Sequence, residues 1–185
     1  MIQKTSKFSA LITLITVFFF WGFIAASNGV FIPFCKDFFN LSQFQSQLID
    51  SAFYGAYYFG ALFLFLYSSR KKIDLINSWG YKKSIIYGLI ISAIGATLMI
   101  PAINIGSFHF ILLSLFILAI GFCLQQTSAN PFTISLGPPE TGSHRLNLAG
   151  GINSLGTTIG PIILSLILFG GIMNTTADIK NINIL

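Results

Sequence analysis

A long interval without charged residues constrains this chain more than any other feature of its sequence. No Asp, Glu, Lys or Arg lies between Lys83 and Glu140, and most residues there are apolar. Because a helix needs about 20 mainly apolar residues to cross a bilayer, this interval has room for two crossings. Only 8% of the whole chain is charged and its mean hydropathy is +0.80, whereas a soluble domain carries roughly 25% charged residues. The sequence therefore predicts an all-α, polytopic membrane protein.

Five segments of the chain are long and apolar enough to cross a bilayer. The first is longer than the core of a signal peptide and lacks a small-residue cleavage site, so we expect it to be retained. Residues 173–185 begin as a polar stretch and turn apolar again, so we expect an external loop and the start of a sixth helix that is cut short. The predicted transmembrane bundle occupies residues 1–172, with helices at about 8–34, 46–67, 84–102, 108–136 and 146–172.

The basic residues are divided unequally between the two sides that these crossings define. Only Lys36 and Lys180 fall on the side opposite to the N-terminus. Cytoplasmic loops are enriched in Lys and Arg, so we expect the N-terminus in the cytoplasm. This topology explains the net charge of +5, which does not indicate a nucleic-acid partner. The basic residues on the N-terminal side are Lys4, Lys7, Arg70, Lys71, Lys72, Lys82, Lys83 and Arg145.

Amide side chains interrupt the fourth apolar segment. Polar groups at membrane depth cost free energy unless they face partners or a water-filled cavity, so they indicate a path for something polar. Gln126 and Asn130 lie four residues apart and share one face of a helix. An amide both donates and accepts hydrogen bonds, as binding of sugar hydroxyls requires. The alternative for both residues is an interhelical hydrogen bond that holds the bundle together.

Asp50 is the only acidic residue well inside a predicted apolar segment. One interpretation is a proton carrier, because partial burial raises the pKa of a carboxyl group towards neutrality. Tyr54, one turn further along the same face, is then a hydrogen-bond partner. The other interpretation is an acid near the start of a helix, where the helix dipole favours negative charge.

Nothing in the sequence indicates catalysis, a metal ion or a cofactor. Cys35 and Cys123 lie in unrelated contexts and suggest neither a disulfide framework nor a zinc site. No phosphate-binding loop, nucleophile elbow or dinucleotide-binding fingerprint is present. We therefore do not expect an enzyme.

A set of short motifs, in order and at consistent spacing, resembles one family of transporters. These motifs are Phe20–Phe23, Ser51–Tyr58, Trp79–Lys83, Thr127–Phe132, Leu136–Gly142, Arg145–Ala149 and Asn153–Gly156. The chain resembles the N-terminal half of a major facilitator superfamily sugar transporter, of the fucose/proton symporter and glucose/galactose transporter group. The resemblance implies twelve helices in two six-helix halves around a central sugar site, with alternating access by rocking of the halves. This chain would supply five helices of the first half.

The resemblance also implies which residues bind sugar. Asn28 and Asn153 match family asparagines, so Asn28, Gln126, Asn130 and Asn153 are the candidate substrate-binding residues. Two acidic residues of the fucose symporter correspond here to Gly29 and Gln126, and neither of these can carry a proton. Asp50 is therefore the candidate for proton coupling in this half, with sodium as the alternative coupling ion.

The sequence favours a monosaccharide permease of the bacterial inner membrane, driven by a cation gradient. We expect it to need the missing C-terminal half, so that these helices alone do not transport. The alternative is a non-transporting membrane sugar sensor or a remnant open reading frame.

Overall fold

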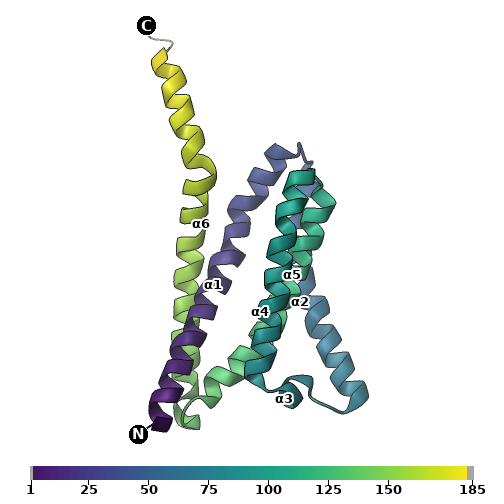
Figure 1. Ribbon diagram of the computed structural model, residues 1–185, viewed down its shortest axis with the longest axis vertical. Coiled ribbons are helices and arrows are strands. Elements are labelled where there is room, and N and C mark those ends of the chain that lie inside the picture. Colours follow the sequence, from purple (N-terminus) through teal and green to yellow (C-terminus); the bar gives the residue numbers. More distant parts are fainter. Residues whose placement is uncertain (1, 183–185) are drawn as a thin grey trace.

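The protein is a bundle of long helices (Figure 1). The computed structural model describes the backbone of residues 2–182 and the side chains of residues 7–170. Five of its helices are long and apolar enough to cross a membrane, which confirms the predicted all-α, multi-pass fold class. The elements are α1 (Ile2–Phe38), α2 (Gln43–Lys71), α3 (Leu75–Trp79), α4 (Tyr81–Ile105), α5 (Phe108–Ser135), the 3-10 helix η1 (Pro139–Thr141) and α6 (Gly142–Ile182).

Capping residues set the ends of several helices. Ser42 forms a capping box with Gln45 at the start of α2, and Ser107 accepts a hydrogen bond from the Phe110 N–H at the start of α5. Gly106, with φ of 70°, ends α4 in the left-handed conformation that glycine adopts without strain. Ser42 and Gly106 lie beyond the apolar segments, so α2 and α4 extend past the ends that hydropathy predicts, whereas α5 begins at Phe108 as predicted.

Two regions differ from the sequence prediction. The connection between α2 and α4 contains the short helix α3, which begins where the Asp74 side chain accepts a hydrogen bond from the Asn77 N–H. The last helix, α6, continues to Ile182 through the predicted external loop. Residues 172–182 contain no Gly or Pro, so no helix-terminating residue interrupts them. The start of a further helix is expected in residues 181–185, of which residues 183–185 lie outside the described residues.

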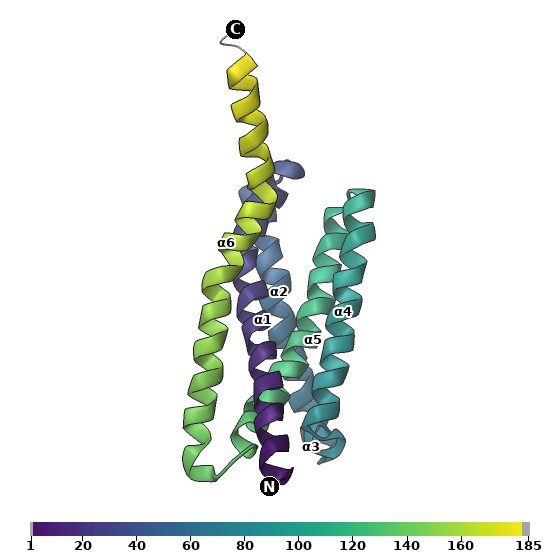
Figure 2. The ribbon, with the colours of Figure 1, turned by 60° about the vertical axis from the view of Figure 1, so that its left-hand side comes forward.

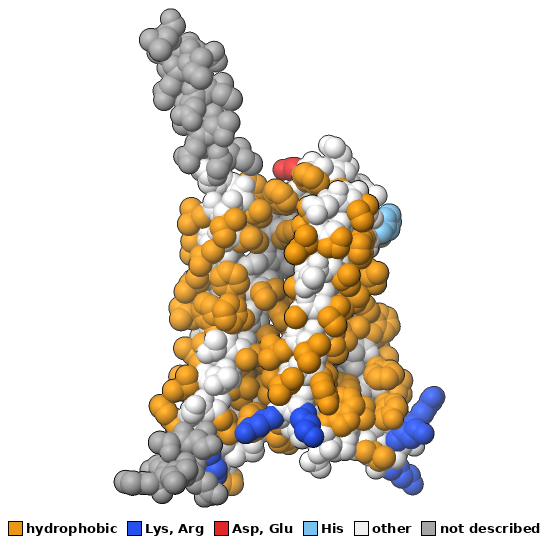
Figure 3. Space-filling model, in the orientation of Figure 1, with side chains coloured by type: hydrophobic (Ala, Val, Ile, Leu, Met, Phe, Trp, Pro, Cys, Tyr) orange, Lys and Arg blue, Asp and Glu red, His pale blue; other side chains and the backbone are white. Residues whose placement is uncertain are grey.

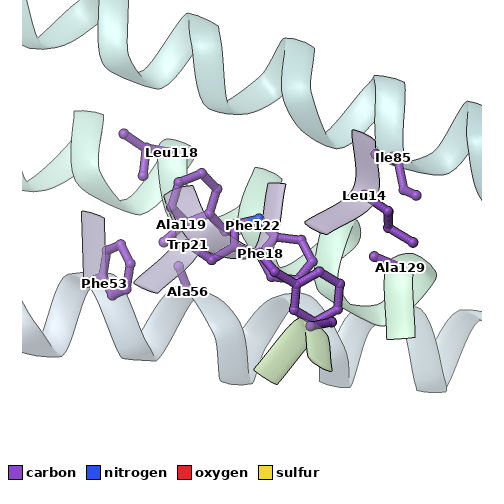
Figure 4. Close-up of a cluster of buried hydrophobic side chains, with 11 residues drawn as sticks. Leu14, Phe18, Trp21, Phe53, Ala56, Ile85, Leu118, Ala119, Phe122 and Ala129 are labelled. Carbon is purple, nitrogen blue, oxygen red and sulfur yellow. The ribbon is translucent and has the colours of Figure 1, made fainter. Parts of the chain in front are cut away.

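Helix α5 lies in the middle of the bundle. In its apolar stretch 61% of the residues are buried, against 11% to 28% in the other four crossings. Helices α2 and α4 pack on α5, while α6 packs along α1 (Figure 2). Trp21, Phe53, Ala56, Leu118 and Phe122 belong to the main core cluster, which joins α1, α2 and α5 and also includes Ile85 of α4 and Ala149 of α6 (Figure 4).

Glycines let α6 approach α1 closely. A side-chain carbon added at Gly156 would collide with the Phe19 carbonyl, and one at Gly160 would collide with the Phe23 carbonyl. The small residues spaced four apart on α6 therefore allow it to pack closely on α1.

The surface is that of a membrane protein with one basic end. Apolar side chains cover most of the face shown in Figure 3, and Lys and Arg gather at one end of it. This is the end that carries the N-terminus, α3 and the connection from α5 to α6 (Figure 1). The basic loops therefore share one end of the bundle, as the topology prediction requires.

Candidate functional site

A cavity of about 460 Å³ opens between α1, α2, α5 and α6. Its volume falls within the range of small-molecule sites. The lining residues are Trp21, Gly22, Ala25, Ala26, Phe53, Tyr54, Tyr57, Gln126, Asn153 and Thr157.

Small residues on α1 make room for the cavity. Gly22, Ala25 and Ala26 follow Trp21 at helical spacing and therefore lie on the same side of α1. Gly22 also meets α6, because an added side-chain carbon there would collide with the Asn153 carbonyl oxygen and approach Thr157 Oγ1 to 2.8 Å. The α1 wall of the cavity is therefore fixed by direct backbone packing against α6.

Aromatic side chains form the wall on α2. The ring centroid of Phe53 lies 5.3 Å from that of Tyr54 and 5.7 Å from that of Tyr57, in edge and tilted arrangements that aromatic pairs prefer. Phe53 is buried, Tyr57 is half-buried and Tyr54 is 56% exposed. This wall offers flat apolar surface together with phenolic hydroxyl groups.

The polar groups of the cavity are neutral. Gln126 comes from α5, and Asn153 and Thr157 come from α6, one turn apart. The two amides can both donate and accept hydrogen bonds, whereas the Thr157 hydroxyl donates to the Asn153 carbonyl at 3.1 Å and can still accept. No lining residue carries a charge. The arrangement therefore suits an uncharged molecule that has several hydroxyl groups and an apolar face.

The structure brings together two of the four predicted substrate-binding residues. Gln126 and Asn153 both line the cavity. Asn153 also links two helices, because its Nδ2 donates to the Phe18 carbonyl at 2.9 Å. Asn153 thus makes an interhelical hydrogen bond, the alternative predicted for Gln126 and Asn130, and its Oδ1 takes no part in that bond. Whether these residues bind sugar stays a prediction.

The other two predicted residues do not line this cavity. Asn28 is 6% exposed within α1, and its Nδ2 has no hydrogen-bond partner among the described residues. Asn130 is half-buried on α5, one turn beyond Gln126. Sugar binding by Asn28 and Asn130 likewise stays a prediction.

Asp50 lies outside the cavity lining, in the second turn of α2. It is half-buried, and the next residue along its face, Tyr54, lines the cavity. The helix-dipole effect falls off within the first turn, and α2 already begins at Gln43 with its cap at Ser42. The dipole therefore does not account for an acid at this position.

The sequence prediction missed the aromatic walls and Thr157. Trp21 and the segment containing Phe53, Tyr54 and Tyr57 fall within motifs of the family resemblance, but the sequence predicts no role for them in sugar binding and places Tyr54 only as a hydrogen-bond partner of Asp50. The available signal was the run of small residues after Trp21, which is the pattern of a helix face that leaves space.

Comparisons with known proteins agree on one family. The family model of the Major Facilitator Superfamily matches residues 10–175. A glucose/galactose transporter of Brucella abortus biovar 1 (strain 9-941) is 38% identical over 95% of this chain and 40% of its own length. A putative glucose/galactose transporter of Helicobacter pylori (strain ATCC 700392 / 26695) is 40% identical over 90% of this chain and 39% of its own length. These relatives are transporters, not enzymes.

Fucose transporters are similar as well. The L-fucose-proton symporter of Escherichia coli (strain K12) is 34% identical over 96% of this chain and 39% of its own length. A crystal structure of the Escherichia coli fucose:proton symporter matches with a TM-score of 0.65 at 34% identity, over 89% of this chain and 37% of that chain. The chain thus spans about two fifths of the length of these relatives.

Proposed function

The chain belongs to the Major Facilitator Superfamily, and on this basis we propose that it forms one side of a transport path for a monosaccharide. The substrate class is a neutral sugar of the fucose, glucose and galactose type. The names of the relatives support this class, since they are glucose/galactose transporters and L-fucose-proton symporters.

The observation that carries the proposal is the chemistry of the cavity. A pyranose ring has hydroxyl groups around its edge and C–H groups on its faces. Gln126, Asn153 and Thr157 supply the hydrogen-bonding groups, while the rings of Tyr54 and Tyr57 supply flat aromatic surface. Pockets that combine a mainly apolar lining with a few placed polar groups are typical of small-molecule sites.

Transport requires that such a site open to each side in turn. In this family the motion is a rocking of two helical bundles about a site near the middle of the membrane. Because the chain spans about two fifths of the length of its relatives, we propose that further helices complete the path. The chain together with those helices is called the complete transporter below. Its membrane is the bacterial inner membrane, with the basic end and the N-terminus in the cytoplasm.

We further propose that transport of the sugar is coupled to a cation gradient. Asp50 is the candidate proton carrier, because it is the acidic residue nearest in sequence to the cavity wall and Tyr54 lies one turn away on the cavity lining. Sodium is the alternative coupling ion.

Counterflow in proteoliposomes tests the function. The complete transporter, loaded with unlabelled sugar, is expected to accumulate labelled L-fucose, D-glucose or D-galactose. Thr157→Val removes a cavity hydroxyl and should weaken that exchange, whereas Thr158→Val removes the neighbouring hydroxyl outside the cavity and should not. No exchange of any of the three sugars would contradict the proposed substrate class.

A further inference from the structure

A buried chain of hydrogen bonds runs from the cavity wall into the bundle. The indole Nε1–H of Trp21 donates to Gln125 Oε1 at 3.1 Å, and Gln125 Nε2 donates to Ser92 Oγ at 2.9 Å. The Ser92 hydroxyl donates to the Leu118 carbonyl at 3.1 Å. Gln125 is 1% exposed, Trp21 4% and Ser92 7%. These hydrogen bonds join α1, α5 and α4.

Each bond in this chain determines the direction of the next. A serine hydroxyl has one hydrogen, and Ser92 gives it to the Leu118 carbonyl. Ser92 Oγ can then only accept, so the amide nitrogen of Gln125 must face it. The carbonyl oxygen of Gln125 consequently faces Trp21, whose indole nitrogen can only donate. The orientation of the amide is thus set by its partners, and each side-chain nitrogen and oxygen in this series of hydrogen bonds has at least one partner.

Close packing of α4 on α5 holds the amide in place. A side-chain carbon added at Gly88 would lie 2.6 Å from Gln125 Cγ, and one at Gly121 would lie 2.6 Å from the Ser92 N. The two glycines therefore allow the backbones to approach until Ser92 and Gln125 bond to each other. A well-packed site of this kind leaves the amide a single arrangement.

We infer that Gln125 is a positioning residue for sugar binding, because it holds Trp21 so that the indole presents its ring and not its N–H to the cavity. This inference rests on the proposed function. Only 4% of Trp21 is exposed, and with its N–H directed into the protein the part of its side chain that lines the cavity is apolar. It therefore favours a C–H group of the sugar on that side, and the hydrogen bonds to the sugar come from the other lining residues Gln126, Asn153 and Thr157.

A pair of substitutions separates positioning from general support of the fold. Gln125→Met keeps the unbranched shape beside Gly88 but removes both amide groups. Trp21→Phe keeps an aromatic ring but has no N–H to direct. If Gln125 acts through the Trp21 N–H, the double variant should bind sugar no more weakly than Trp21→Phe alone.

The experiment measures the dissociation constant for L-fucose, D-glucose or D-galactose, whichever wild type exchanges, on purified complete transporter, with the folded fraction determined separately. Gln125→Met should raise that constant by about tenfold (about 1.4 kcal/mol), the size of one net hydrogen bond. Ser128→Ala is the matched control, because it removes a buried hydroxyl on the same helix that bonds only within α5. Its dissociation constant should stay unchanged.

Two results would overturn the inference. The first is an unchanged dissociation constant in Gln125→Met, with only the folded fraction reduced, which is what a purely structural role produces. The second is additivity of the two substitutions in the double variant. Failure of wild type to bind any of the three sugars would instead count against the proposed function itself.

Discussion

Substituting Gly156 by alanine tests how α1 and α6 build the cavity. The added carbon would lie 3.0 Å from the Phe19 carbonyl carbon and 3.0 Å from the Phe23 N, with the Phe19 oxygen nearer still. These are backbone atoms, so no flexible side chain can move aside. Carbon atoms prefer separations of about 3.5–4.0 Å, and the Phe19 oxygen lies nearer than either of these atoms, so the two helices must move apart locally by at least roughly 1 Å.

The change in the free energy of unfolding of Gly156→Ala is the sum of two opposing effects. Forcing an extra methyl group into a close-packed contact costs about 1–3 kcal/mol, and Gly156 is buried. Replacing glycine by alanine within a helix stabilises it by up to about 1 kcal/mol. Gly151→Ala on the same helix is the matched control, because nothing among the described residues lies within 4 Å of the added carbon. The two variants should therefore change stability in opposite directions.

The free energy of unfolding is measured by titrating the purified complete transporter with SDS and following helicity by circular dichroism. We expect Gly156→Ala to lose about 1–2 kcal/mol net. Sugar affinity should fall too, because Asn153 and Thr157 flank the displaced turn. Equal stability of the two variants would refute the close approach of α1 and α6.

Three further variants test other parts of the account. Asp50→Asn should abolish sugar-driven pH change and leave sugar exchange intact, and unchanged uphill uptake would move coupling to sodium or to helices beyond this chain. Arg145→Lys keeps the charge but loses the planar group that donates to the carbonyls of Thr133, Ile134 and Pro138, so thermal denaturation should show a loss of about 1–2 kcal/mol. Asn28→Leu removes the unpartnered Nδ2, so the free energy of unfolding should change by less than about 1 kcal/mol, while sugar binding should weaken if Asn28 is a sugar ligand. A large loss of stability with unchanged sugar binding would assign Asn28 a structural role.

The membrane crossings could be predicted because what drives a helix into the bilayer is the apolar composition of that segment alone. An uncharged stretch such as the one between Lys83 and Glu140 has no stable place except the membrane or a protein core. The ends of the helices were harder to predict, because caps such as Ser42 and Gly106 lie beyond the apolar residues. Helix α3 has only five residues and therefore no readable periodicity.

The cavity was only partly predictable, since its walls depend on how helices meet. Gln125 and Gln126 are neighbours with the same chemistry, yet one turns into the bundle towards Trp21 and Ser92 while the other lines the cavity. A one-residue step rotates a side chain by about 100° around a helix, so only packing distinguishes them. The aromatic wall could not be predicted for a different reason. With 20 Phe and 6 Tyr in the chain, composition does not mark the few that face a cavity.

Protection of a single cysteine by sugar tests the central claim most directly. Thr157→Cys places a thiol on the cavity lining, and Thr158→Cys places one on the adjacent residue outside it. The native Cys35 and Cys123 are buried, so their background reaction with a bulky maleimide is slow. In the complete transporter, L-fucose, D-glucose or D-galactose should slow alkylation of Thr157→Cys and leave Thr158→Cys unaffected. Equal protection at both positions, or none at Thr157→Cys by any of the three sugars, would contradict a sugar site in this cavity.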